Sequence, residues 1–272
     1  MRRGAIELLE WLATGRGKRP ALVVVAAHPD DESIGAGGRL ARLAAARFIC
    51  VTDGAPRGGV DAAEAGCASR EEYARVRRAE LATALALAGV APPNLYQIKV
   101  VDQEASANLV ALVHILAAFL RSGAADAVVT HAYEGGHPDH DATALAVRAA
   151  CRLLAKTDRP APAILEMTSY HAAAGGGMEA GAFLPADGDV ASDVLTGEQR
   201  ALKTALFACY ATQRRVLGDF PIDVERFRAA PDYDFSRPPH AGKPYYEHFS
   251  WGMDGARWRD LAMRALGELG LA

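Results

Sequence analysis

The chain of 272 residues has little cysteine and no large excess of either charge. Its four cysteines lie far apart and form no C-x-x-C pair, which argues against a disulfide framework and against a structural zinc site built from thiolates. They fit reduced, mostly buried thiols: Cys50, Cys67, Cys151 and Cys209. Thirty Lys and Arg stand against 33 Asp and Glu, and this near balance argues against a nucleic-acid-binding surface.

Long hydrophobic runs are also missing. The longest apolar run near the amino terminus, residues 21–27, is well short of the ~20 residues that span a bilayer. The stretch before it is broken by Glu7 and Glu10 and lacks a small-residue cleavage pattern, so a signal peptide is not expected. We therefore expect a cytoplasmic protein without a membrane span, and an oligomer is compatible with the sequence.

The sequence does contain a regular alternation of short β-rich runs and alanine-rich segments of helical period. Strands are expected at 21–27, 48–52, 95–100, 127–131 and 163–167, and helices at 4–13, 36–46, 70–89, 106–121, 141–156 and 197–213. This alternation is typical of a three-layer, Rossmann-like α/β fold, with helices on both faces of a mostly parallel sheet. We expect one domain over residues 1–272, with its core at about 20–215 and an aromatic C-terminal extension at about 216–272 that packs against the sheet.

Two histidine-rich motifs follow two of these strands. Residues 27–32 read AHPDDE directly after the first strand, and residues 137–140 read HPDH shortly after the fourth strand. Ligands of open α/β sheets bind at the carboxyl ends of the strands, where the strand order reverses. In the common order 3-2-1-4-5 the first and fourth strands are neighbours at that point, so we expect the two motifs to lie side by side.

The residue types in these motifs suit a catalytic metal. His28, Asp31 and His140 form a ligand set that a zinc ion accepts while keeping one position open for water. Asp30 could take a proton from the metal-bound water. His137 could act as a cationic partner that stabilises an oxyanion and protonates an amine leaving group.

The remaining acids of the motifs have two possible roles. Asp139 and Glu32 could orient the imidazole rings, or they could cap the helices that follow. A regulatory module that holds magnesium through the paired acids Asp30 and Asp31 is an alternative from another functional class. It would leave the motif histidines without a role, because magnesium prefers oxygen ligands.

A group of glycines after the first motif offers another alternative. Gly35, Gly37 and Gly38, with Asp53 at the end of the second strand, suggest a dinucleotide-binding fingerprint. The match fails because Leu40 stands where the third glycine is required and because nearby acids would repel a pyrophosphate. Close packing of the first helix is the better explanation of these glycines.

The two motifs resemble those of the PIG-L/LmbE family of zinc-dependent de-N-acetylases, HPDDE and HPDH. The resemblance extends over about residues 20–215 and includes Thr52-Asp53-Gly54, R-x-x-E-L at 77–81, Thr130-His131 and KTALFACYATQ at 203–213. It implies a site with zinc, or ferrous iron in the cell, and the following roles: His28, Asp31 and His140 as metal ligands, Asp30 as general base, His137 as electrostatic and acid partner, and Arg77 as a substrate contact. Asp53 and His131 are further matched positions with a supporting or substrate-binding role.

The reaction implied by the resemblance is hydrolysis of the N-acetyl group of an amino sugar or glycoconjugate, as in N-acetylglucosaminyl deacetylases. Amide cleavage in a larger thiol-sugar conjugate is the alternative. Some members have a tyrosine two residues before the HPDH histidine, where this chain has Gly135. A phenol would then have to come from Tyr133 or from the extension, or be absent.

Substrate selection is expected in two loops and in the extension. The loops are residues 54–68 and 170–195. The extension offers rings that could stack on sugars or simply pack against the sheet: Tyr245, Tyr246, His248, Trp251 and Trp258.

Overall fold

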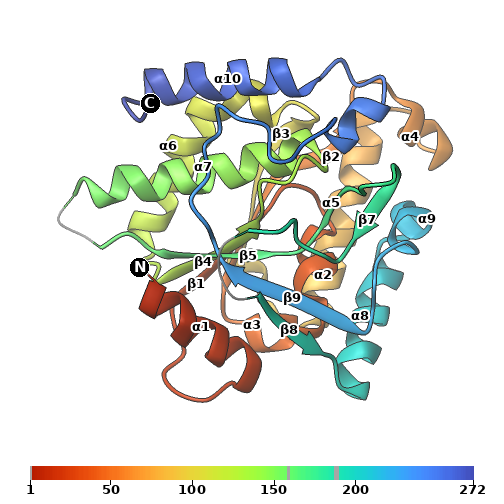
Figure 1. Ribbon diagram of the computed structural model, residues 1–272. Coiled ribbons are helices and arrows are strands. Elements are labelled where there is room, and N and C mark those ends of the chain that lie inside the picture. The colour runs from red at the N-terminus through yellow and green to blue at the C-terminus, as the bar shows by residue number, and fades with distance from the viewer. Residues whose placement is uncertain (1, 158–159, 187–189) are drawn as a thin grey trace.

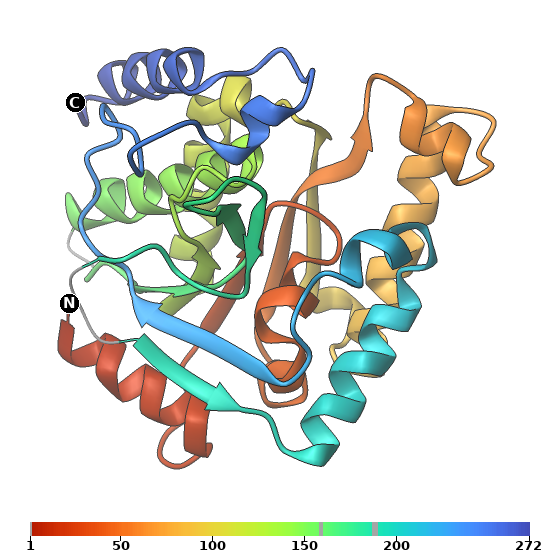
Figure 2. The same ribbon diagram turned by 45° about the vertical axis from the view of Figure 1, so that its right-hand side comes forward.

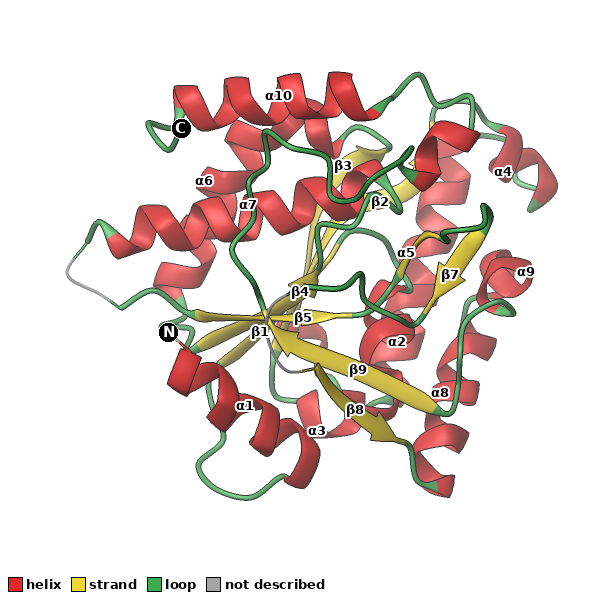
Figure 3. Cartoon of the chain, viewed as in Figure 1, coloured by secondary structure: helices red, strands yellow, loops and turns green. Residues whose placement is uncertain are grey.

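The computed structural model describes residues 2–157, 160–186 and 190–272. Its middle layer is a seven-stranded sheet in the order β3-β2-β1-β4-β5-β9-β8 (Figures 1 and 3). Strands β1 to β5 are parallel, and β9 and β8 extend the sheet as antiparallel strands. Their bounds are β1 Leu22–Ala26, β2 Arg47–Pro56, β3 Leu95–Asp102, β4 Ala127–His131, β5 Ala163–Met167, β8 Val190–Val194 and β9 Val224–Ala229. A small second sheet pairs β6 (Tyr170–Ala172) with β7 (Met178–Ala180).

Helices cover both faces of this sheet (Figure 2). One face carries α1 (Arg2–Thr14), α2 (Asp31–Ala36), η1 (Gly37–Arg39), α3 (Leu40–Leu43), α5 (Arg70–Leu87) and α8 (Gly197–Cys209). The other carries η3 (Ala105–Asn108), α6 (Leu109–Ser122), α7 (Pro138–Ala155) and α10 (Gly255–Glu268). Alternate residues of β1 point to the two faces: Leu22 and Val24 join one core, and Val23 and Val25 join the other.

Short elements complete the described chain: α4 (Val60–Glu64), η2 (Pro92–Asn94), η4 (Ala211–Gln213), α9 (Arg214–Leu217) and η5 (Tyr245–His248). By length and composition alone, Ala105–Ser122 could cross a membrane. Here one side of the segment, which includes Leu112 and Leu116, is buried in the core that α6 shares with α7 and α10, whereas Ile115 on the other side is exposed. This segment is therefore a core helix of the α/β layer.

The three-layer α/β fold and the order 3-2-1-4-5 predicted from the sequence are confirmed. The expected helices at 36–46 and 141–156 begin earlier, at Asp31 and Pro138, so each starts inside its histidine motif. The extension does more than cover the sheet, because its strand β9 lies between β5 and β8.

The glycines after the first motif allow close packing, as predicted. A Cβ atom at Gly35 would lie 2.6 Å from Met167, and one at Gly38 would lie 2.7 Å from Leu195. The tight fit brings α2 against the end of β5 and η1 against the segment that follows β8. It fixes the helix that carries Asp31 without involving a nucleotide.

Candidate metal centre

The two histidine motifs meet at the carboxyl ends of β1 and β4. These strands pair directly, which brings His28 next to His137 and His140 although more than a hundred residues separate them. Asp30 is the residue before α2, and His137 is the residue before α7, so both helices begin at this site. A cavity of about 450 Å³ opens here and is lined by His28, Asp30, Asp31, His137 and His140 among others.

Three predicted ligands form a compact buried group. Nδ1 of His28 lies 3.1 Å from Nε2 of His140 and 3.2 Å from Oδ2 of Asp31, and His140 Nε2 lies 3.1 Å from Asp31 Oδ1. Burial opposes ionisation of Asp31, but the neighbouring His140 and His131 lower its pKa well below the usual range. This group, His28, Asp31 and His140, is called the ligand trio below.

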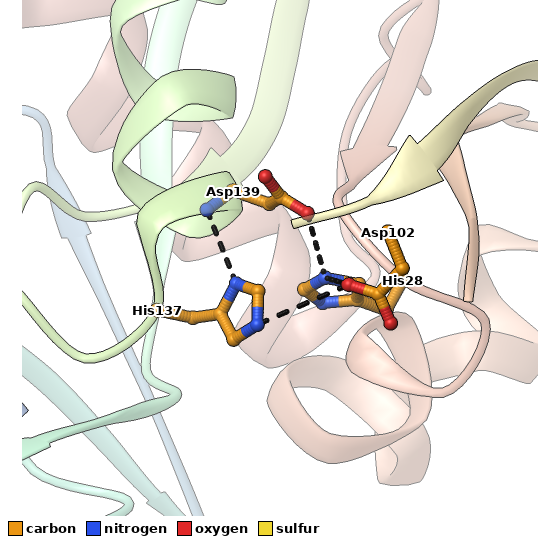
Figure 4. A group of neighbouring side chains, drawn as sticks. All are labelled: His28, Asp102, His137 and Asp139. Atoms are coloured by element: carbon orange, nitrogen blue, oxygen red, sulfur yellow. Dashed lines mark hydrogen bonds and ion pairs between the residues drawn. The ribbon is translucent and has the colours of Figure 1, made fainter. Parts of the chain in front are cut away.

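A second group surrounds the outer side of His28 (Figure 4). Nε2 of His28 lies 3.1 Å from Asp102 Oδ1 and 3.3 Å from Asp139 Oδ2. The two carboxylate oxygens of Asp139 also accept hydrogen bonds from the backbone N–H groups of Gln103 and Ala105, at 2.6 and 2.9 Å. Both carboxylate oxygens of Asp139 therefore have hydrogen-bond partners. Its contact with Nε2 also orients the His28 ring so that Nδ1 faces Asp31 and His140.

These contacts decide which group fits a metal ion. His28 Nε2 faces carboxylates, and His140 Nδ1 lies 3.4 Å from Ser169 Oγ. The other nitrogens, His28 Nδ1 and His140 Nε2, therefore remain available to bind a metal ion. In the second group, which consists of His28, Asp102, His137 and Asp139, both oxygens of Asp139 already accept hydrogen bonds from backbone N–H groups. Burial alone would lower the pKa of His28, yet the carboxylates of Asp102, Asp139 and Asp31 raise it well above its usual value, which means that positive charge is favoured here. Two imidazole nitrogens and one carboxylate suit zinc or ferrous iron.

The proposed base, Asp30, lines the cavity beside the trio. Burial raises the pKa of this carboxyl to about 7, although the Arg77 guanidinium, 3.2 Å away, opposes the shift. Asp30 has a positive φ of 134°, which is unusual for a residue with a side chain. Glu32 helps to hold this conformation, since its carboxylate accepts the Asp30 N–H at 3.3 Å and the hydroxyl hydrogens of Ser33 and Tyr210.

Glu32 thus supports the backbone of the base and does not orient an imidazole ring. Asp139 is also not a helix cap. The capping residue of α7 is His137, whose Nδ1 accepts the Asp139 N–H at 3.1 Å. Because Nδ1 accepts this hydrogen bond, neutral His137 carries its proton on Nε2. Burial and the nearby His28 lower the pKa of His137 well below its usual value, so a neutral N–H donor faces the cavity.

Of the other predicted positions, Arg77 and His131 lie at the site and Asp53 does not. Arg77 is buried and lines the cavity, and its Nε and Nη1 have no hydrogen-bond partner within the described residues. His131 stacks on the His140 ring at 4.1 Å and supports it from behind. Asp53 does not line the cavity. It binds Arg70 at 2.7 Å and accepts backbone N–H groups at the ends of β2 and β3.

Asp102 also lies at the site, although neither sequence motif contains it. It ends β3, lies 3.1 Å from His28 and 3.9 Å from His137, and lines the cavity. An acid at the carboxyl end of a third parallel strand was the available signal. Burial opposes its ionisation, but His28 and its hydrogen bond to Asp102 lower the pKa of Asp102 far below the usual range.

The position of Gly135 explains why no tyrosine stands there. Its φ is +71°, and a Cβ atom would lie 3.2 Å from Pro239 and 3.3 Å from Pro244 of the extension. Tyr133 does not replace the missing phenol, because its hydroxyl donates to the Arg237 carbonyl and its ring stacks on Trp258. Of the rings named in the extension, Trp251 lines the cavity, as does Tyr170 of β6. Within the expected loop 170–195, residues 187–189 lie outside the described residues.

Comparison with solved structures finds the same fold in several enzymes. A40926 pseudoaglycone deacetylase is 22% identical, with a TM-score of 0.60, and the match covers 80% of this chain and 99% of that one. N,N′-diacetylchitobiose deacetylase from Pyrococcus horikoshii is 19% identical, with a TM-score of 0.55 and 79% of each chain covered. A 4-carboxy-2-hydroxymuconate hydratase from Pseudomonas putida is 16% identical, with a TM-score of 0.53, and the match covers 79% of this chain and 98% of that one.

A search among curated proteins found no match. Comparison with protein families matches residues 23–151 to the family described as PIG-L, GlcNAc-PI de-N-acetylase. The matched range contains both histidine motifs, the ligand trio and Asp30. The resemblance inferred from the motifs is confirmed, because residues 23–151 of the chain match the PIG-L family.

Proposed function

We propose that the protein is a metal-dependent hydrolase that removes the N-acetyl group from an amino sugar or glycoconjugate. The observation that carries the proposal is the ligand trio, which opens into a cavity with Asp30 beside it. The match of residues 23–151 to a de-N-acetylase family supports the same reaction, and so do two structural relatives that are deacetylases. The hydratase relative shows that the fold alone does not determine the chemistry.

The side chains around the cavity suit amide hydrolysis. A zinc or ferrous ion held by His28, Asp31 and His140 would polarise the acyl group and activate a water molecule. Asp30 accepts the proton of that water, and Arg77 keeps its carboxylate in place from 3.2 Å. His137 donates a hydrogen bond from Nε2 to the carbonyl oxygen as negative charge develops there. The water oxygen adds to the acyl carbon, and the proton on Asp30 passes to the nitrogen as the C–N bond breaks, which gives acetate and a free amine.

This role for His137 differs from that of a cationic acid. Its Nδ1 is occupied by the Asp139 N–H, and a second proton on the ring would remove that hydrogen bond. A neutral imidazole N–H can still stabilise an oxyanion, as long as it is held in place. The cap position at the start of α7 fixes the ring in this way.

The magnesium-binding module is a weaker candidate. The two acids have different partners here, because Asp31 lies within 3.3 Å of imidazole nitrogens of three histidines, whereas Asp30 pairs with Arg77. Magnesium prefers oxygen ligands, whereas the trio offers two nitrogens and one carboxylate. Cleavage of a larger amide conjugate keeps the same site, and a substrate comparison separates it from the leading proposal.

The direct test is acetate release. Protein stripped with a chelator and reloaded with one equivalent of zinc is assayed on N-acetylated sugars, nucleotide sugars, lipid-linked sugars and larger amide conjugates. We expect acetate from an N-acetylglucosamine-type substrate and none from the stripped protein. Larger amides turning over while every N-acetyl sugar is inert would contradict the substrate proposal.

The base is tested by Asp30→Asn, with Asp53→Asn as the matched control. The first change removes the proton acceptor and should lower kcat by about 10²- to 10⁴-fold, with zinc content unchanged. The second changes a strand-end acid that does not line the cavity, and kcat should change by less than about twofold. Equal activity in Asp30→Asn and the wild type would remove Asp30 from the mechanism.

A further inference from the structure

The C-terminal extension places two aromatic side chains in the wall of the cavity, Trp251 and the buried Phe220. Tyr246 and Trp258 are 1% and 0% exposed. Trp251, by contrast, is partly exposed and lines the cavity, and its ring centroid lies 4.8 Å from that of His137. Because His137 is itself 4.4 Å from His28 in the ligand trio, Trp251 lies next to the reacting centre.

We propose that Trp251 is the surface on which the pyranose ring of the substrate stacks while its acylated amine is at the ligand trio. This inference rests on the proposed deacetylase function and extends it, because it names a specificity-determining residue and the shape of the group it recognises. Trp251 lies outside residues 23–151, the range that matches the family.

The backbone next to Trp251 is held against the histidine motif. The Tyr245 N–H donates to the Gly135 carbonyl at 2.7 Å, two residues before His137. Pro239 and Pro244 pack closely over Gly135, where a Cβ atom would lie only 3.2 and 3.3 Å from them. The segment from 239 to 251 is therefore fixed on the loop that presents His137.

The Trp251 ring is also held by other rings. Phe249 stacks on it at 4.4 Å with an interplanar angle of 11°, and Tyr245 contacts Phe249 at 5.4 Å. Tyr245 contacts Tyr170 at 5.8 Å, and Tyr170 contacts His140 at 5.4 Å. This aromatic row runs from a ligand residue to Trp251. A ring held in this way loses little conformational freedom when a ligand stacks on it.

The cavity as a whole suits a ligand with one apolar face and polar edges. Trp251 and Tyr170 provide aromatic surface, whereas the side chains from α4, η4 and α9 add many polar groups: Asp61, Glu64, Thr212, Gln213 and Arg215. A pyranose ring presents C–H groups on one face and hydroxyl groups around its edge, so it can use both kinds of surface. The volume of about 450 Å³ lies in the range that encloses a ligand larger than an acetamide.

The test compares two substrates that share the amide and differ in the ring. N,N′-diacetylchitobiose carries the pyranose, and N-acetylethanolamine does not. Trp251→Ala should raise KM for the sugar about tenfold, which corresponds to about 1.4 kcal/mol of binding, and change kcat by less than about twofold. KM for N-acetylethanolamine should not change. Trp251→Phe keeps an aromatic face and should recover most of the loss.

Tyr96→Ala is the control for removing an aromatic side chain elsewhere. Tyr96 is 43% exposed on β3, contacts Phe119 and does not line the cavity, so both KM values should match the wild type. Equal KM for the sugar in Trp251→Ala and the wild type would overturn the proposal. A loss shared by both substrates would overturn it as well, because it would show a general disturbance of the site.

Direct binding separates this inference from the proposed function. Zinc-loaded Asp30→Asn protein, with and without Trp251→Ala, is titrated with N,N′-diacetylchitobiose in a calorimeter. A tenfold weaker Kd in the double variant supports stacking even if the wild type releases no acetate. An unchanged Kd overturns stacking even if the wild type is an active deacetylase.

Discussion

Two aspartates in the first turn of α7 give a sharp test of how the site is held. Each oxygen of Asp139 accepts one backbone N–H, from Ala105 and from Gln103. In Asp141 a single oxygen, Oδ1, accepts both of its backbone partners, the N–H groups of Glu134 and Gly135 at 3.1 and 3.0 Å. Both residues are buried, at 0% and 1% exposure, so burial does not distinguish them.

Substitution by asparagine should therefore have opposite consequences. In Asp139→Asn the new NH₂ group must face one backbone N–H, and a buried amide left without an acceptor costs about 1–3 kcal/mol of stability. Loss of the contact to His28 should also weaken zinc binding by about 10- to 100-fold. In Asp141→Asn the carbonyl oxygen can serve both amides. Burial raises the pKa of Asp141 to about 8, so the native side chain is already neutral at pH 7, and the cost should stay below about 1 kcal/mol.

Urea unfolding of the metal-free proteins at pH 7 gives the two stability changes, and zinc titration of the folded proteins gives the two affinities. We expect Asp139→Asn to lose both stability and zinc affinity. Asp141→Asn should lose less than about 1 kcal/mol of stability and keep the zinc affinity of the wild type. This prediction is refuted if the two variants lose equal stability, or if Asp139→Asn binds zinc as tightly as the wild type.

Two further predictions concern buried charges. Burial raises the pKa values of Glu134 and Asp141 from 4.5 and 3.8 to about 8, so each of these two groups binds more proton in the folded protein than in the unfolded chain between about pH 4.5 and 8. Their contribution to the free energy of unfolding should fall as pH rises through that window, and urea unfolding of the wild type and Asp141→Asn at pH 5.5 and 8.5 checks the sign. Lys203 pairs with Glu225 at 3.2 Å, so Lys203→Met leaves a buried carboxylate without a counter-charge and should lower the free energy of unfolding by about 3–5 kcal/mol. The double variant Lys203→Met/Glu225→Gln should recover much of that loss in the same assay.

The parallel part of the fold and the position of the trio could be predicted because their causes are local or topological. The runs that form β1 and β4 are buried on both faces and therefore read as continuous apolar strands. Their neighbouring places in the sheet bring His28 and His140 together without any knowledge of side-chain contacts. The sequence was sufficient for these features since strand order determines which strand ends meet.

The antiparallel edge of the sheet could not be predicted from a pattern of apolar residues. Strand β9 carries Glu225 and Arg228, two charged residues that look incompatible with a buried strand. Both are paired inside the protein, Glu225 with Lys203 and Arg228 with Glu166, and those partners are distant in sequence. Asp102 was missed for a related reason, because its role depends on a contact with His28 across two strands.

The place of β9 in the sheet has a consequence for how the chain is made. Strand β8 precedes β9 in sequence but pairs only with β9 among the described strands, so it has no partner while a nascent chain is still shorter than 224 residues. Until then β5 also keeps an open edge, since β9 is its antiparallel neighbour. The parallel half of the protein can form on the ribosome, but the edge closes after residues 224–229 have emerged. A premature stop after β8 but before residue 224 therefore leaves a chain that has both histidine motifs and exposes an unpaired strand edge, the kind of surface through which chains aggregate.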